Sequence, residues 1–146
     1  MKRFRSENEL LRFGSKIACE LKAGDVVTLS GPLGTGKTTL ARGILQGLGH
    51  AGEVPSPTFA LVQPYDDLLP PVWHVDLYRL ETPDEAASLD LEEIIENGSL
   101  LVEWPDKGGR HVPEPALAIT LAGTGDAPRQ LTAIVPPDWE ARWANL

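Results

Sequence analysis

A glycine-rich segment near the N-terminus has the residue types that bind nucleotide phosphates. Gly31, Gly36, Lys37 and Thr38 fill the four fixed positions of the pattern G-x-x-x-x-G-K-[ST]. In this pattern, glycines let backbone N–H groups surround the phosphates, the lysine reaches the β- and γ-phosphates, and the hydroxyl group ligates Mg²⁺. The sequence therefore predicts a site for a nucleoside triphosphate and Mg²⁺. The residues expected there are Gly34, Thr35, Gly36, Lys37, Thr38 and Thr39.

The segments on both sides of this loop fit such a site. Residues 26–30 form an apolar, β-branched run typical of a strand, and residues 38–48 have helical spacing and end before Gly49. A helix that begins at the loop directs its positive end at a bound anion. The alternative is a chance lysine in a glycine-rich turn, and the flanking strand and helix disfavour it. ATP is favoured over GTP because the guanine-binding pattern Asn-Lys-x-Asp does not occur.

Two carboxylates compete for the role of metal ligand. An enzyme with a phosphate loop needs a carboxylate at the end of a neighbouring strand to hold Mg²⁺. Glu103 ends the continuous apolar run of residues 99–102, as expected of a buried central strand, whereas Asp76 lies in a segment that alternates apolar and polar residues. We therefore expect Glu103 to hold the metal together with Thr38. For Asp76, spacing leaves open a catalytic role or an ion pair with a nearby basic residue.

Four further residues have both a functional and a structural interpretation. Ser56 and Thr58 lie in a proline-rich segment and could offer a hydroxyl group to the γ-phosphate or its metal, or belong to a loop without function. His74 is more often a hydrogen-bonded structural residue than a metal ligand. Trp104 either belongs to the core or covers the nucleotide.

Predicted helices and strands alternate along the rest of the chain. The pattern Ser/Thr-x-x-Glu predicts helix starts at Ser6 and Thr82, and two apolar runs around the turn at residues 123–126 predict an antiparallel hairpin. Cys19 is expected to be a small buried residue of the first helix. The expected helices are residues 7–22, 38–48, 82–96 and a short terminal helix capped by Asp138, and the expected strands are residues 26–30, 59–62, 73–78, 99–104, 117–121 and 131–135.

Length and charge limit the classes of function. The 146 residues fit a single domain spanning residues 1–146, and the absence of a signal sequence or a long apolar run makes the cytoplasm the expected compartment. The net charge of −8 divides into +4 for residues 1–50 and −12 for residues 51–146. A surface this acidic disfavours direct binding of a nucleic-acid backbone, so a partner would have to hold any nucleic acid.

Three segments downstream of the phosphate loop carry a resemblance to a known family. They are Ser-Pro-Thr-Phe at residues 56–59, His-Val-Asp-Leu-Tyr-Arg-Leu at residues 74–80 and Val-Glu-Trp-Pro at residues 102–105. Together with the loop they resemble the TsaE family (formerly YjeE), the small ATPases of bacterial tRNA N6-threonylcarbamoyladenosine synthesis. The resemblance runs in order along residues 11–121 and covers nearly the whole chain.

The resemblance implies a fold and an activity. It implies a three-layer α/β nucleotide-binding fold of the P-loop type, with a mixed, mainly parallel sheet. It also implies Mg²⁺-dependent ATP hydrolysis that is weak in the isolated protein and depends on the partners TsaB and TsaD. These partners form the transferase that modifies adenosine 37 of tRNA, so tRNA would be contacted only indirectly, through the complex.

The resemblance also assigns roles to individual residues. Lys37 and Thr38 would hold the phosphates and Mg²⁺, Glu103 would be the second metal ligand, and Asp76 would be a catalytic carboxylate. Ser56 and Thr58 would belong to a switch-like loop. The residues implied to lie near the nucleotide are Trp104 and, on weaker similarity, Glu7 and Arg129.

Two departures from the family pattern and two other functions remain open at this point. Pro32 and Thr35 replace the usual Asp and Ala in variable positions of the loop, and Asp90 stands where the family usually has a glycine. The loss of that glycine leaves the local loop geometry open. The other functions are a nucleotide-gated assembly module without essential hydrolysis and a small-metabolite kinase, which would need an anion-binding lid.

Overall fold

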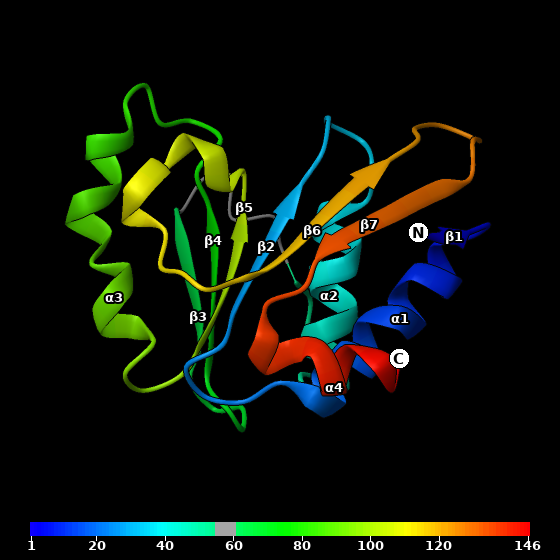
Figure 1. Cartoon of the computed structure of the whole chain (residues 1–146), viewed down its shortest axis with the longest axis horizontal. Coiled ribbons are helices and arrows are strands. Elements are labelled where there is room, and N and C mark those ends of the chain that lie inside the picture. Colours follow the sequence, from blue (N-terminus) through cyan, green and yellow to red (C-terminus); the bar gives the residue numbers. More distant parts are fainter. Residues whose placement is uncertain (55–60) are drawn as a thin grey trace.

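The computed structural model describes residues 1–54 and 61–146. The strands are β1 (Lys2–Phe4), β2 (Val26–Ser30), β3 (Val62–Tyr65), β4 (Val72–Asp76), β5 (Ser99–Glu103), β6 (Leu117–Ala122) and β7 (Arg129–Ile134). The α-helices are α1 (Glu7–Glu20), α2 (Lys37–Gly47), α3 (Leu91–Ile94) and α4 (Glu140–Ala144), and the 3₁₀ helices are η1 (Pro83–Leu89), η2 (Pro105–Lys107), η3 (Gly109–His111) and η4 (Pro137–Trp139). The sheet lies between two helical layers, with α1, α2 and α4 on one face and η1 and α3 on the other (Figure 1).

The described strands form a mixed sheet in the order β1-β7-β6-β2-β5-β4-β3. β2 pairs in parallel with β5 and β6, and β4 pairs in parallel with β5. The outer pairs β1–β7, β6–β7 and β3–β4 are antiparallel, so β3 and β7 run against the other strands. The expected α/β class, the mixed and mainly parallel sheet, and the hairpin around residues 123–126 are thus confirmed.

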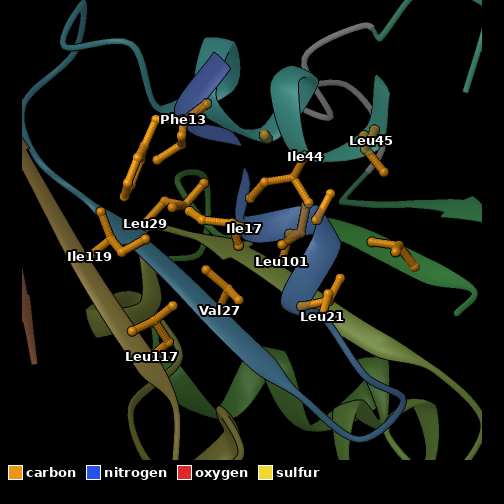
Figure 2. Packing of buried hydrophobic residues seen from close by; sticks show 14 of the residues in the cluster. Phe13, Ile17, Leu21, Val27, Leu29, Ile44, Leu45, Leu101, Leu117 and Ile119 are labelled. Carbon is orange, nitrogen blue, oxygen red and sulfur yellow. The ribbon is translucent and has the colours of Figure 1, made fainter. Parts of the chain in front are cut away.

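Apolar residues alternate between the two faces of the central strands and form a core on each side of the sheet. Val27 of β2 and Leu101 of β5 face α1 and α2, whereas Val26 and Leu100 face η1 and α3. Figure 2 shows the first of these cores, where Ile17 of α1 lies with side chains from α2 and the sheet. Because both faces of β2 and β5 are covered, their sequences are continuous apolar runs rather than alternating ones.

Glycines bring α1 and α2 into close contact. A Cβ atom on Gly14 of α1 would lie 2.8 Å from the Leu40 carbonyl oxygen of α2, and one on Gly43 of α2 would lie 2.5 Å from the Leu11 carbonyl oxygen of α1. Only a residue without a side chain permits this backbone approach. The contact fixes α2, the helix that follows the glycine-rich loop, against the N-terminal helix.

The predicted helix over residues 82–96 is wrong as a single element. It begins as expected, because the Glu85 carboxylate accepts the Thr82 backbone N–H at 3.0 Å. It then breaks at Asp90, whose backbone is left-handed at φ 51°, so that η1 and α3 are separate. Glycine, which the family resemblance leads us to expect at this position, would adopt positive φ without strain, and aspartate is among the residues that tolerate it.

Three smaller expectations also differ from the structure. Cys19 is exposed because it lies off the buried stripe of α1. Asp138 lies inside η4 and does not cap α4. The strand expected at residues 59–62 begins at Val62, and the first two of the expected residues lie outside the described part of the chain.

No described helix combines the length and the apolar character needed to cross a bilayer.

Candidate nucleotide-binding site

A cavity of about 690 Å³ opens where β2, β4 and β5 end, beside the start of α2. The carboxyl ends of parallel strands meet at this edge of the sheet, which is the usual ligand position in α/β folds. The glycine-rich loop and the ends of β4 and β5 supply one part of the lining. The N-terminal segment around Ser6 and the β6–β7 turn around Asp126 supply another.

The glycine-rich loop has a backbone that requires glycine. Gly31, Gly34 and Gly36 all have positive φ, at 138°, 81° and 99°. A Cβ atom on Gly31 would collide with the Leu121 carbonyl oxygen, and one on Gly36 would lie 2.7 Å from Leu10. The loop can therefore bend its backbone N–H groups toward the cavity without a side chain in the way.

Thr35 supports this loop from inside. Its side chain is fully buried, and its hydroxyl donates a hydrogen bond of 2.8 Å to the Pro32 carbonyl oxygen. Unlike Gly34, Gly36, Lys37, Thr38 and Thr39, it does not line the cavity. The structure thus brings five of the six expected phosphate-binding residues to the cavity and places the side chain of the sixth behind it.

Lys37 is a buried cation at the floor of the cavity. Its side-chain ammonium donates to the carbonyl oxygens of Gly31 at 2.6 Å and Pro32 at 2.9 Å, and lies 4.4 Å from the centre of the Trp104 ring. Burial lowers the pKa of Lys37 below its usual value, and the carboxylates of Glu103 and Asp76 partly offset this effect. The charge is thus poorly solvated, and an anionic ligand in the cavity would stabilise it.

Thr38 and Glu103 meet across the interface between α2 and β5. The Thr38 hydroxyl lies 3.2 Å from each of the two Glu103 carboxylate oxygens, and Glu103 is 2% exposed. These hard oxygen atoms suit Mg²⁺, which binds through few protein ligands and keeps waters and substrate phosphates in its coordination shell. Within the described residues there is no cluster of three or more His, Cys, Asp or Glu side chains that could hold a metal alone. The donor set therefore fits Mg²⁺ bound together with a nucleotide.

Asp76 lies beside Glu103 at the same end of the sheet. The two residues are partners in the β4–β5 register, both are buried, and both line the cavity. The Asp76 carboxylate accepts the Tyr78 backbone N–H at 2.8 Å, which orients the side chain at the strand end. The structure therefore places both candidate carboxylates side by side at the edge of the sheet that lines the cavity.

His74 contacts Glu103, a pairing that the sequence analysis did not predict. Its Nε2 atom lies 2.7 Å from a Glu103 carboxylate oxygen, and the imidazole is fully buried. From the sequence, His74 was expected only to be a hydrogen-bonded structural residue, with no partner indicated. No local signal could connect His74 with a residue 29 positions away in another strand.

Trp104 and Tyr78 form an aromatic wall of the cavity. Their ring centres are 4.9 Å apart, and both residues line the cavity next to Lys37. Trp104 has a left-handed backbone, with φ at 59°, a conformation that is uncommon for a bulky residue and often found at functional sites. Tyr78 is 39% exposed and was not singled out from the sequence as a site residue.

Glu7 at the start of α1 and Arg129 at the start of β7 also line the cavity. Arg42 donates to the Glu7 carboxylate at 3.4 Å, and Arg129 donates to the carbonyl oxygens of Ala127 at 2.6 Å and Gly125 at 3.2 Å. Arg129 thus braces the β6–β7 turn that borders the cavity. The expected switch-like residues Ser56 and Thr58 lie outside the described residues.

Comparisons with known proteins agree with the family resemblance seen in the sequence. The family profile described as "Threonylcarbamoyl adenosine biosynthesis protein TsaE" matches residues 4–131. The tRNA threonylcarbamoyladenosine biosynthesis protein TsaE of Haemophilus influenzae is 39% identical over 83% of this chain and 80% of its own. That of Streptomyces coelicolor is 38% identical over 90% and 92%. The crystal structure of Bacillus subtilis YdiB matches with a TM-score of 0.82 and 31% identity, over 99% of this chain and 90% of that one.

Proposed function

The chain belongs to the TsaE family of tRNA threonylcarbamoyladenosine biosynthesis proteins, and we propose that it hydrolyses ATP with Mg²⁺ in that pathway. The observation that carries the proposal is the convergence of Lys37, Thr38 and Glu103 on one cavity at the end of a glycine-rich loop. We take the fold as a P-loop nucleotide-binding fold in a single domain of residues 1–146.

In this proposal the loop and α2 bind the phosphates. Backbone N–H groups of Gly34 and Gly36 surround them, and the start of α2 directs its positive end at them. The Lys37 ammonium exchanges its two loop carbonyl partners for phosphate oxygens. This exchange is favourable because a bond between an ammonium and an anion is stronger than one to a neutral carbonyl.

The reacting end of the nucleotide lies beside the carboxylates. Thr38 and Glu103 would hold Mg²⁺, and the metal would supply neutralisation of phosphate charge. Asp76 is the catalytic carboxylate, and its position next to Glu103 lets it orient a water at the γ-phosphate. Trp104, which lines the cavity, would cover the nucleotide, and Glu7 and Arg129, which also line it, would border the nucleotide. We assign Ser56 and Thr58 to the switch-like loop on the basis of the family resemblance.

Partner proteins complete the proposed activity. We propose that TsaB and TsaD stimulate hydrolysis, that tRNA is reached only through this complex, and that the protein acts in the cytoplasm. The acidic charge of −12 over residues 51–146 supports indirect contact with tRNA, because direct binding to its backbone depends on Lys and Arg. In this proposal the isolated protein hydrolyses ATP only weakly, and the partners supply the stimulation.

A single-turnover hydrolysis assay tests this function. Purified protein with radiolabelled ATP and Mg²⁺ should release phosphate slowly, and adding TsaB and TsaD together should accelerate release at least tenfold. The Lys37→Ala variant is the matched control and should show no acceleration. If TsaB and TsaD leave the rate unchanged while ATP still binds, the nucleotide-gated assembly module becomes the better description.

A further inference from the structure

The Glu103 carboxylate is held from two sides by residues of different elements. Thr38 of α2 contacts both of its oxygens, and His74 of β4 approaches one oxygen at 2.7 Å. His74 is fully buried and Glu103 is 2% exposed, so solvent does not compete for this contact. A hydrogen bond to a buried carboxylate is among the stronger ones in proteins.

The geometry determines which imidazole nitrogen carries the hydrogen. A hydrogen must lie between Nε2 and the carboxylate oxygen, because two lone pairs at 2.7 Å would repel each other. His74 Nδ1 is buried and has no hydrogen-bond partner in the described part of the chain. An orphaned acceptor is tolerated more readily than an orphaned N–H group. Both observations favour the tautomer with its hydrogen on Nε2.

We propose that His74 is a positioning residue whose Nε2–H group fixes the Glu103 carboxylate in the orientation that faces Thr38. The inference rests on the proposed function, in which Thr38 and Glu103 hold Mg²⁺. His74 does not line the cavity, so its effect on the site passes through Glu103. Without the hydrogen bond, the Glu103 side chain could rotate away from Thr38, and the two oxygen ligands would no longer converge.

Two substitutions separate this role from simple space filling. His74→Leu fills the buried volume without a donor, whereas His74→Gln offers an amide N–H at similar reach. In titrations of Mg²⁺ at fixed ATP, followed with a fluorescent ATP analogue, His74→Leu should raise the half-maximal Mg²⁺ concentration about tenfold. His74→Gln should stay within about threefold of the native chain. In EDTA all three proteins should bind the analogue equally, because the phosphate loop is intact.

Two results in this titration would overturn the inference. One is an unchanged Mg²⁺ requirement in His74→Leu, and the other is an equal rise in both variants, which would mean that bulk and not the donor matters. If the native chain binds no ATP, the proposed function fails instead.

Nitrogen-detected NMR of the His74 ring in the nucleotide-free native protein tests the hydrogen bond independently of ATP and of variant folding. The hydrogen should be on Nε2, and its resonance should shift in Glu103→Gln. A hydrogen found on Nδ1 alone would overturn the inference.

Discussion

The Thr38 hydroxyl lies 3.2 Å from both carboxylate oxygens of Glu103, although 65 positions separate the two residues in the chain. Thr38 is the second residue of α2, and Glu103 is the last residue of β5. The parallel pairing of β2 with β5 brings them together, because it places the loop after β2 next to the end of β5. The distance is therefore a consequence of the sheet topology.

Substitution of Thr38 should separate metal binding from nucleotide binding. Thr38→Val keeps the shape of the side chain but lacks the hydroxyl oxygen, whereas Thr38→Ser keeps that oxygen. We expect Thr38→Val to abolish the gain in ATP affinity on adding Mg²⁺ and Thr38→Ser to preserve it. Isothermal titration with ATP in Mg²⁺ and in EDTA measures this difference. Equal Mg²⁺ dependence in both variants would remove Thr38 from the metal site.

Asp76 should affect turnover more than affinity. Asp76→Asn retains an oxygen that can accept the Tyr78 backbone N–H, so the strand end keeps its geometry while the negative charge is lost. We expect kcat to fall by about 100-fold, the size of a typical general-base contribution, with KM for ATP changed less than threefold. Steady-state hydrolysis with the partner proteins gives both constants. A raised KM with unchanged kcat would assign Asp76 a structural role.

The left-handed backbone at residue 90 should make glycine more stable there than alanine. The φ of 51° at Asp90 is strained for a side chain and relaxed for glycine, so Asp90→Gly should raise the free energy of unfolding relative to Asp90→Ala by about 1 kcal/mol. Both variants remove the Asp90 carboxylate, whose hydrogen bond and charge raise the pKa of Glu93, so the comparison isolates the backbone. Urea denaturation measures the difference. Equal stability of the two variants would contradict the strain.

A buried ion pair at the opposite end of the sheet should matter for stability alone. Arg142 of α4 donates to both carboxylate oxygens of Asp25, at 2.6 and 3.1 Å, just before β2 begins. Arg142→Met leaves the Asp25 charge buried and should cost about 3–5 kcal/mol in the free energy of unfolding. The double variant Asp25→Asn/Arg142→Met should cost less. ATP affinity of the folded proteins should not change, and a shared loss of affinity would link α4 to the site.

The parts of the fold that could be predicted are those with local causes. The loop at residues 31–38 and the β6–β7 hairpin each follow from a few adjacent residues. Glu103 could be placed at a strand mouth because an apolar run of adjacent residues ends there. The break at Asp90 could not be predicted because the helical pattern continues through it, and only the backbone φ of 51° in the structure reveals the left-handed turn.

The contacts that could not be predicted join distant segments. His74 meets Glu103 and Asp25 meets Arg142 only after the strands are ordered, and these partners are 29 and 117 positions apart. Cys19 was misplaced for a different reason, since an isolated cysteine is usually buried but here lies one residue outside the apolar stripe of α1. Neighbouring residues in the chain therefore do not reveal the order of the strands in the sheet or which side of a helix faces the core.

We propose that nucleotide chemistry at this site drives the tRNA modification. The most direct test of this proposal is the amount of N6-threonylcarbamoyladenosine in tRNA from cells whose only copy of this protein is the native chain, Lys37→Ala or Ile134→Ser. Ile134 is 77% exposed and does not line the cavity, so its variant controls for expression. We predict normal modification with the native chain and Ile134→Ser, and loss of it with Lys37→Ala at equal protein levels. Normal modification in the Lys37→Ala cells would mean that the modification does not depend on nucleotide chemistry at this site.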